Sequence, residues 1–162
     1  MKIQATHPDT GKTIILDMPS LTDEQIREMS RDFATERELK AKLENLPISA
    51  EGKVFLTKLL KYTINIGGTV IKFGKKLIEI TVYILTKLTH LTFWTILAAI
   101  LAFLISIIPG IGPVISPIIS PILVIGGLSK GFYEQIKSIE PSIIDVIEEA
   151  TSSFAPLKGH AL

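Results

Sequence analysis

The stretch LTFWTILAAILAFLISIIP, at residues 91–109, contains no charged residue. The uncharged interval around it is longer still, because no Asp, Glu, Lys or Arg occurs between Lys87 and Lys130. As a helix, the residues before Pro109 would be about 27 Å long at ~1.5 Å per residue, close to the ~30 Å hydrocarbon core of a bilayer. We therefore predict a helix that inserts into a membrane.

Residues at the two ends of the uncharged interval fit a membrane–water interface. Aromatic side chains stand at the start of the apolar stretch, where an aromatic belt would lie, and polar or basic residues flank it. The residues expected at this interface are His90, Phe93, Trp94 and Lys130.

A turn and a second apolar arm follow the first helix. The turn contains Pro and Gly, and the arm VISPIISPILVIGGL spans residues 114–128. Because proline removes a helical hydrogen bond, we expect the return arm to be broken. The residues predicted to shape this hairpin turn are Pro109, Gly110, Gly112, Pro113, Pro117 and Pro121. Spanning and re-entrant insertion both stay open.

The segment 116–121, SPIISP, resembles the proline knot of oleosin-type lipid-droplet hairpins. Pro117 and Pro121 keep one spacing of that knot, whereas six residues instead of five separate Pro109 from Ser116. The arrangement is also similar to the hydrophobic hairpin of colicin-type pore-forming domains. Neither resemblance assigns a function to this chain.

Residues 51–90 carry seven lysines and two acids, Glu51 and Glu79. Projected at ~100° per residue, the lysines fall on one arc of a helix and the apolar residues on the opposite arc. Gly67-Gly68 would kink or split such a helix, and the β-branched residues around it keep a strand alternative open. The helix would lie on an anionic membrane surface, or it would pack its apolar face on the N-terminal domain. The lysines expected to contact such a membrane surface are Lys53, Lys58, Lys61, Lys72, Lys75, Lys76 and Lys87.

The residue patterns at the two ends of the chain predict smaller elements. Strands at residues 3–7 and 13–16 would form a β-hairpin, and a helix would run from about Thr22 to Leu43. The tail carries two short amphipathic patterns. We therefore predict a mainly α fold: a soluble head at 1–50 (β-hairpin and helix), a long Lys-faced amphipathic helix at 51–90, an apolar helical hairpin at 91–128, and a tail of short helices at 129–162.

Several classes of chemistry have no support in the residues. The chain has no Cys, so disulfides, thiolate catalysis and Cys-ligated zinc are excluded. His7, His90 and His160 are far apart in sequence and offer neither metal-ligand spacing nor a Ser/His/Asp set. We expect no enzyme activity, no metal and no cofactor. The lysine arc lacks Arg, which disfavours nucleic acid as a partner, and the first residues do not resemble a signal peptide.

These observations predict a non-enzymatic, membrane-inserting helical-hairpin protein. Copies would associate to form a pore or channel, or would anchor a larger assembly such as a virion or secretion machine. The expected partners are a lipid bilayer with anionic lipids and further copies of the chain, with the head and tail on the same side of the membrane. The alternatives are a soluble helical oligomeric interaction protein with the apolar hairpin as its shared core, and a monotopic coat on a lipid surface.

Overall fold

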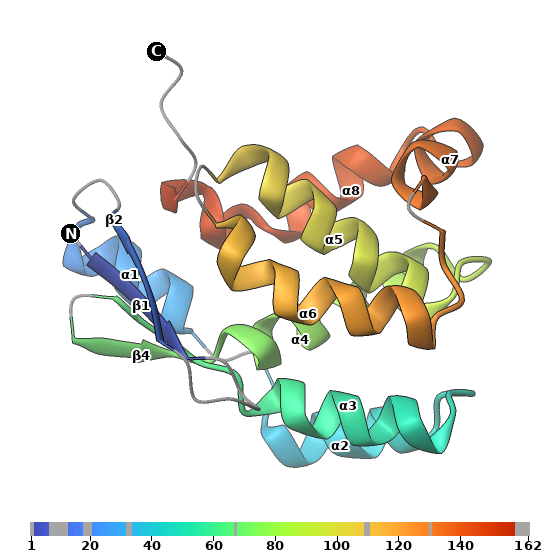
Figure 1. The fold of residues 1–162 in the computed structure, drawn as a ribbon, viewed down its shortest axis with the longest axis horizontal. Coiled ribbons are helices and arrows are strands. Elements are labelled where there is room, and N and C mark those ends of the chain that lie inside the picture. Colours follow the sequence, from blue (N-terminus) through green and yellow to red (C-terminus); the bar gives the residue numbers. More distant parts are fainter. Residues whose placement is uncertain are drawn as a thin grey trace. The chain divides into compact units, whose positions relative to one another are not determined.

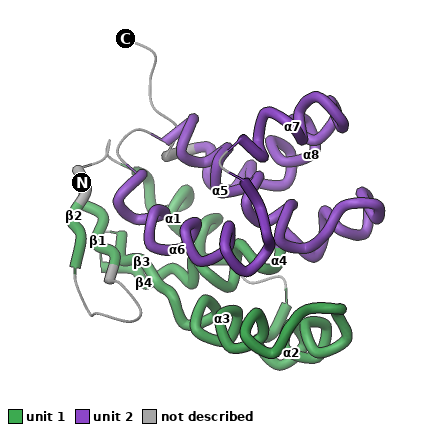
Figure 2. Tube along the Cα trace, turned by 45° about the vertical axis from the view of Figure 1, so that its right-hand side comes forward, with its two compact units in different colours: residues 1–79 green, residues 80–162 purple. Residues whose placement is uncertain are grey.

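The computed structural model describes residues 2–6, 13–17, 21–31, 34–66, 68–108, 111–129 and 131–157 (Figure 1). The chain divides into two compact units, residues 1–79 and 80–162 (Figure 2). The predicted mainly helical fold with an N-terminal strand pair and short C-terminal helices is confirmed. This division falls inside a helix, α4 (Phe73–Lys87).

Unit 1 contains a four-stranded antiparallel sheet. Its strands are β1 (Lys2–Thr6), β2 (Thr13–Asp17), β3 (Ile64–Ile66) and β4 (Thr69–Ile71), in the order β2-β1-β3-β4. The predicted N-terminal hairpin is therefore half of a larger sheet, because β3 pairs with the free side of β1. This arrangement supplies the further strands that an isolated hairpin needs for stability.

The two faces of this sheet differ in polarity. One face buries Ile3, Ala5, Ile64, Ile66 and Ile71. The register places a second set of residues in one row across the other face, namely Ile15, Gln4, Asn65 and Val70. Within this row all but the half-buried Asn65 are exposed, so the sheet is covered on one side only.

The helix predicted from Thr22 to Leu43 is two helices, α1 (Asp23–Ser30) and α2 (Glu36–Glu44). Arg31 has an extended backbone and ends α1. The Thr35 hydroxyl accepts a hydrogen bond from the backbone N–H of Glu38 at 3.1 Å, which caps the start of α2. Sequence periodicity does not predict this boundary. The Thr35 hydroxyl can cap α2 because the Thr35 backbone is extended, and the spacing of apolar residues does not reveal that conformation.

The long amphipathic helix predicted at 51–90 is also interrupted. Residues 50–60 form α3 (Ala50–Leu60), the strand pair β3–β4 follows, and α4 begins at Phe73. The strand alternative holds at this point because β-branched residues flank a turn at Gly68, whose φ is +87°. The Asn65 side-chain oxygen accepts a hydrogen bond from the Gly68 N–H at 3.0 Å and fixes the turn.

Unit 2 is built around one apolar helix. Besides the second half of α4, it contains α5 (Phe93–Ile107), α6 (Gly112–Ile125), α7 (Phe132–Ile139), α8 (Ile143–Ala150) and the 3-10 helix η1 (Ser152–Leu157). Helices α6, α7 and α8 all pack on α5 (Figure 1). Ten residues of α5 are buried, so this helix is the core of unit 2.

The prediction of a membrane-inserting hairpin is wrong for this structure. The Thr92 hydroxyl caps the start of α5 and the helix ends at Ile107, which leaves 15 residues, or about 22 Å at ~1.5 Å per residue. A bilayer core is ~30 Å thick. Among the described residues, no helix combines the length and the apolarity needed to cross a membrane. The same finding overturns three further predictions: the membrane localisation, the pore or channel, and the placement of head and tail on one side of a bilayer.

Candidate interaction surface

The seven lysines predicted to share one arc fall into three groups. Lys58, Lys61, Lys72 and Lys87 are exposed, Lys53 is half-buried, and Lys75 and Lys76 are buried. The first three in sequence belong to α3 and its C-cap, whereas the last three belong to α4. A projection onto a single helix therefore does not describe where these charges lie.

Lys75 forms a buried ion pair within α4. Its Nζ lies 3.1 Å from Glu79 Oε1, one helical turn away, and both side chains are more than nine-tenths buried. Within the described part of the chain, the two Glu79 oxygens have no hydrogen-bond partner. The ion pair with Lys75 is thus what compensates the buried carboxylate, because an unpaired buried charge is costly.

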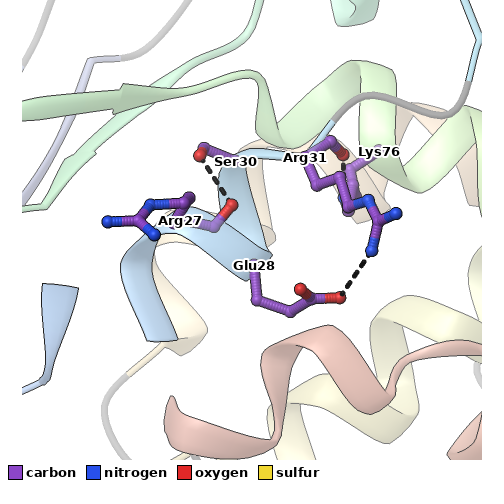
Figure 3. Close-up of polar contacts among 5 residues, drawn as sticks. All are labelled: Arg27, Glu28, Ser30, Arg31 and Lys76. Carbon is purple, nitrogen blue, oxygen red and sulfur yellow. Dashed lines mark hydrogen bonds and ion pairs between the residues drawn. The ribbon is translucent and has the colours of Figure 1, made fainter. Parts of the chain in front are cut away.

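Lys76 and Lys53 each bind the end of another helix. The Lys76 ammonium donates to the carbonyl of Arg31, the C-cap of α1 (Figure 3). The Lys53 ammonium donates to the carbonyl of Glu44, the last residue of α2, at 3.4 Å. The C-terminal end of a helix carries partial negative charge and unpaired carbonyls, so a cation there is stabilising. Both lysines therefore have structural partners.

Lys87 lies beside an aromatic ring at the end of α4. Its Nζ is 5.1 Å from the centre of the Tyr83 ring, within the range of a cation–π contact. A hydrogen bond with Tyr83 raises the pKa of Lys87. The contact with Tyr83 thus favours the charged form of this lysine.

His90 pairs with a glutamate from the α7–α8 connection. His90 Nε2 lies 2.8 Å from Glu140 Oε2, and the Ser142 hydroxyl donates to Glu140 Oε1 at 2.5 Å. The hydrogen bond from Ser142, followed by His90, lowers the pKa of Glu140. Because the carboxylate stands between the imidazole and the hydroxyl, His90 cannot act as a general base on Ser142. This cluster links the residues before α5 to the α7–α8 connection.

The aromatic residues expected at a membrane interface are packed inside unit 2. Phe93 and Trp94 are both buried, with ring centres 5.4 Å apart in an edge-to-face arrangement. The Trp94 side chain contacts Gly126 so closely that a Cβ on this glycine would lie 2.7 Å from Trp94 Cβ. The start of α5 is thus packed against the end of α6. Lys130 lies outside the described residues.

The prolines and glycines assigned to the hairpin turn lie in or beside α6. Pro109 and Gly110 are outside the described residues, whereas Gly112, Pro113, Pro117 and Pro121 are part of the helix. The helix stays continuous because Pro113 occupies its first turn, where no N–H is needed. Pro117 and Pro121 are spaced by one turn and remain partly exposed, so the hydrogen bonds they remove lie away from the core.

Helix α6 presents an uncharged face to solvent. Val114, Ile115, Ile118 and Ile122 are buried on its inner face. The exposed residues lie three or four positions apart on the opposite face, and we call this set the outer stripe: Pro113, Ser116, Ser120 and Val124. Val124 has 80% of its surface exposed. No Asp, Glu, Lys or Arg occurs anywhere in residues 112–125.

The outer stripe differs from the exposed faces of α7 and α8. The exposed positions of α7 include Glu134 and Gln135, and those of α8 include Asp145, Glu148 and Glu149. A charged outer face is the usual pattern for a helix at the surface of a globular protein. The absence of charge, rather than one exposed valine, is therefore the informative feature of α6.

Other parts of the described chain offer little for chemistry. Among the residues that the structure describes, no three His, Asp or Glu side chains gather to hold a metal ion. A shallow depression in unit 1 is lined by Thr35, Glu36, Arg37, Lys40, Ala41 and Glu44. All of these residues belong to α2 or its N-cap, so the depression is the flank of one solvated helix rather than a binding cleft.

Comparison of the chain with protein-family models, with curated proteins and with solved structures gives no match.

The sequence contained a signal for the outer stripe that a membrane interpretation concealed. Ser116, Ser120 and Val124 are spaced by four, as expected for one helical face. In a helix placed in lipid, these serine hydroxyls would donate hydrogen bonds to the carbonyls that the prolines leave without an N–H partner. In a helix packed on α5, the same spacing marks the side that faces away from the core.

Proposed function

We propose that this chain is a non-enzymatic interaction protein that self-associates through the outer stripe of α6. The observation that supports it is a surface helix of 14 residues without one charged side chain. The occupant of this surface is a second copy of the chain.

The lack of charge favours a second copy over an unrelated partner. A charged partner surface would lose water against the outer stripe without gaining an opposite charge, and burying an unpaired charge is unfavourable. Another α6 brings an uncharged face by construction. In a two-fold arrangement the same patch serves both copies, so no like charges face each other.

The polar groups of the stripe also complement one another. Pro117 and Pro121 have no N–H to offer to the carbonyls of Pro113 and Pro117, which leaves two backbone acceptors near the exposed side. Ser116 and Ser120 supply hydroxyl donors on the same face. Two antiparallel copies of α6 therefore bring donors and acceptors to each other, while Val124 adds apolar area.

This proposal assigns different roles to the two apolar helices. Helix α5 is buried by the chain's own helices, so it is the core of unit 2. Helix α6 covers α5 with one face and offers the other. The part of the apolar hairpin that two copies share is thus the outer stripe alone.

Substitution of Val124 by lysine tests the proposal. The site is in the last turn of α6, where a cation suits the helix dipole, so the fold should be unaffected. Two ammonium groups would meet across the interface, and we expect the dissociation constant of the dimer to rise at least tenfold. Size-exclusion chromatography with light scattering measures the average mass.

Ile139→Lys is the matched control. Ile139 is the last residue of α7 and is exposed to a similar degree, but it lies outside the outer stripe. The control should keep the mass of the natural chain. An unchanged mass in Val124→Lys, or an equal decrease in both variants, would overturn the proposal.

A further inference from the structure

Strand β2 is an edge strand in which Asp17, at its end, is the one charged residue. It stands at one end of the sheet, and its register with β1 runs from Lys2–Asp17 to Thr6–Thr13 without a bulge. Its sequence, TIILD, contains neither Lys nor Pro. Natural edge strands are commonly protected by lysines, prolines or bulges. Within the part of the chain that the structure describes, β2 pairs with β1 on one side only.

The register shows which backbone groups of the sheet face outward. Ile66 and Thr69 are paired across a two-residue connection, so they form the hydrogen-bonded pair that closes a tight turn. Bonded and non-bonded pairs alternate along an antiparallel ladder. Asn65 therefore directs its N–H and C=O toward Gln4 of β1 rather than toward β4.

The same alternation continues across β1 to β2. Because Gln4 bonds with β3, its pair with Ile15 is non-bonded, and Ile15 directs its N–H and C=O away from β1. Thr13 and Asp17, two positions away on either side, do the same. The Ile15 side chain has 61% of its surface exposed. The outward edge of β2 thus combines outward-directed backbone groups with an exposed apolar residue.

We propose that β2 pairs in antiparallel fashion with β2 of a second copy, about a two-fold axis at Ile15. Ile15 of one copy then lies opposite Ile15 of the other, and Thr13 lies opposite Asp17. No like charges meet, and about six backbone hydrogen bonds form. The two sheets become one continuous sheet of eight strands.

The opposite edge of the sheet is a poorer candidate. Strand β4 has three residues, and α1 packs against it. By the same alternation only Val70 directs its backbone outward, so a partner would gain few hydrogen bonds. Val70 is nevertheless as exposed as Ile15 and lies in the same row, which makes it a matched control.

This interface goes beyond the proposed function because it uses unit 1 and a different surface. It does not need the outer stripe of α6. A failure of one contact therefore leaves the other intact, and the two can be measured separately.

A cysteine placed at the two-fold axis tests the pairing. The natural chain has no Cys, so Ile15→Cys introduces a single thiol. A bonded antiparallel pair holds its Cα atoms about 5.5 Å apart, within the range of roughly 4.4–6.8 Å that a disulfide requires. Under mild oxidation we expect Ile15→Cys to form a disulfide-linked dimer, seen on a non-reducing gel, at least tenfold faster than Val70→Cys.

A second pair of variants tests the register. Thr13→Cys mixed with Asp17→Cys should give a linked heterodimer, whereas Asp17→Cys alone should not, since two copies of residue 17 would lie about 14 Å apart. Ile15→Cys should still cross-link when it is combined with Val124→Lys. Equal rates for Ile15→Cys and Val70→Cys, or rapid cross-linking of Asp17→Cys alone, would overturn the proposal. The proposal would also be overturned if the Ile15→Cys protein stayed monomeric because an extended segment of another protein occupied the β2 edge.

Discussion

Lys76 illustrates how the position of one charge depends on residues far away in the sequence. Its ammonium binds the carbonyl of Arg31, 45 positions earlier, at the C-terminal end of α1. Lys75, its neighbour, turns instead to Glu79 in the same helix. Both lysines appeared on one polar arc from periodicity alone. The tertiary fold brings acceptors to some lysines of such an arc, and those lysines are the ones that can be buried.

Replacing Lys76 by methionine should destabilise the fold. Methionine keeps most of the buried stem but removes the donor to the Arg31 carbonyl, and hydrogen bonds that involve a charged group contribute about 1.5–3 kcal/mol. Urea unfolding should show a loss in this range. Lys42→Met, at an exposed position of α2, should change the free energy of unfolding by less than about 0.5 kcal/mol. Equal losses in the two variants would contradict this role for Lys76.

Because of Tyr62, the free energy of unfolding depends on pH in the alkaline range. Burial raises the pKa of Tyr62 from its ordinary value of 10.0 to about 12. Below pH 10 the phenol is neutral in both the folded and the unfolded chain, so its contribution is fully present. Between pH 10 and about 12 it ionises in the unfolded chain first, and the free energy of unfolding falls. Tyr62→Phe should lose less stability between pH 9 and pH 11 than the natural chain in urea titrations, and equal losses would be inconsistent with this account.

At the scale of elements, Gly74 permits the close contact between α3 and the start of α4. Its N–H donates to the carbonyl of Tyr62 at 2.9 Å. A Cβ at this position would lie 1.7 Å from the backbone oxygen of Leu59, which a side-chain rotation cannot relieve. The end of α3 and the beginning of α4 therefore require a residue without a side chain.

Gly74→Ala should consequently cost more than about 2 kcal/mol in the free energy of unfolding, because backbone must move. Gly112→Ala is the control, since Gly112 is also helical and has open space around the new methyl group. Alanine there should be neutral or stabilising by up to about 1 kcal/mol. Thermal unfolding of both variants measures the difference, and a similar cost at the two sites would refute the packing argument.

The elements also show what local patterns can and cannot predict. The N-terminal hairpin and the two short C-terminal helices follow from turn residues and apolar spacing, and the structure confirms them. The break between α1 and α2 does not, because it depends on the backbone conformation at Thr35. At 51–90, a projection at 100° per residue places lysines on one arc whether or not the segment is helical throughout. The β3–β4 pair forms there because β1 offers a free edge, which is a tertiary property.

The candidate surface was the least predictable feature. The uncharged interval was evident in the sequence, but apolar residues in a long run fit both a lipid environment and a protein core. Thr92 decides the length of α5 by capping its start, and the packing of α7 and α8 on α5 supplies the partners that lipid would otherwise provide. Only after α5 is placed in the core does the outer stripe of α6 become distinguishable as a surface.

For the whole molecule, the two proposed contacts together predict assembly beyond a dimer. The outer stripe of α6 belongs to unit 2 and the β2 edge belongs to unit 1. A chain with two separate two-fold contacts forms a tetramer or a longer array. We predict that the natural chain is larger than a dimer in light scattering at high concentration, and that Ile15→Lys and Val124→Lys each reduce it to a dimer. A natural chain that stops at a dimer would mean that one of the two contacts does not form.

The self-association of α6 is tested most directly in a chain that cannot pair through β2. Sedimentation equilibrium of Ile15→Lys over a wide range of concentrations isolates the contact made by the outer stripe. The average mass should rise from the 17.8 kDa of one chain toward twice this value, and adding Val124→Lys should hold it at one chain throughout. A mass of 17.8 kDa for Ile15→Lys at every concentration would contradict the proposed role of α6.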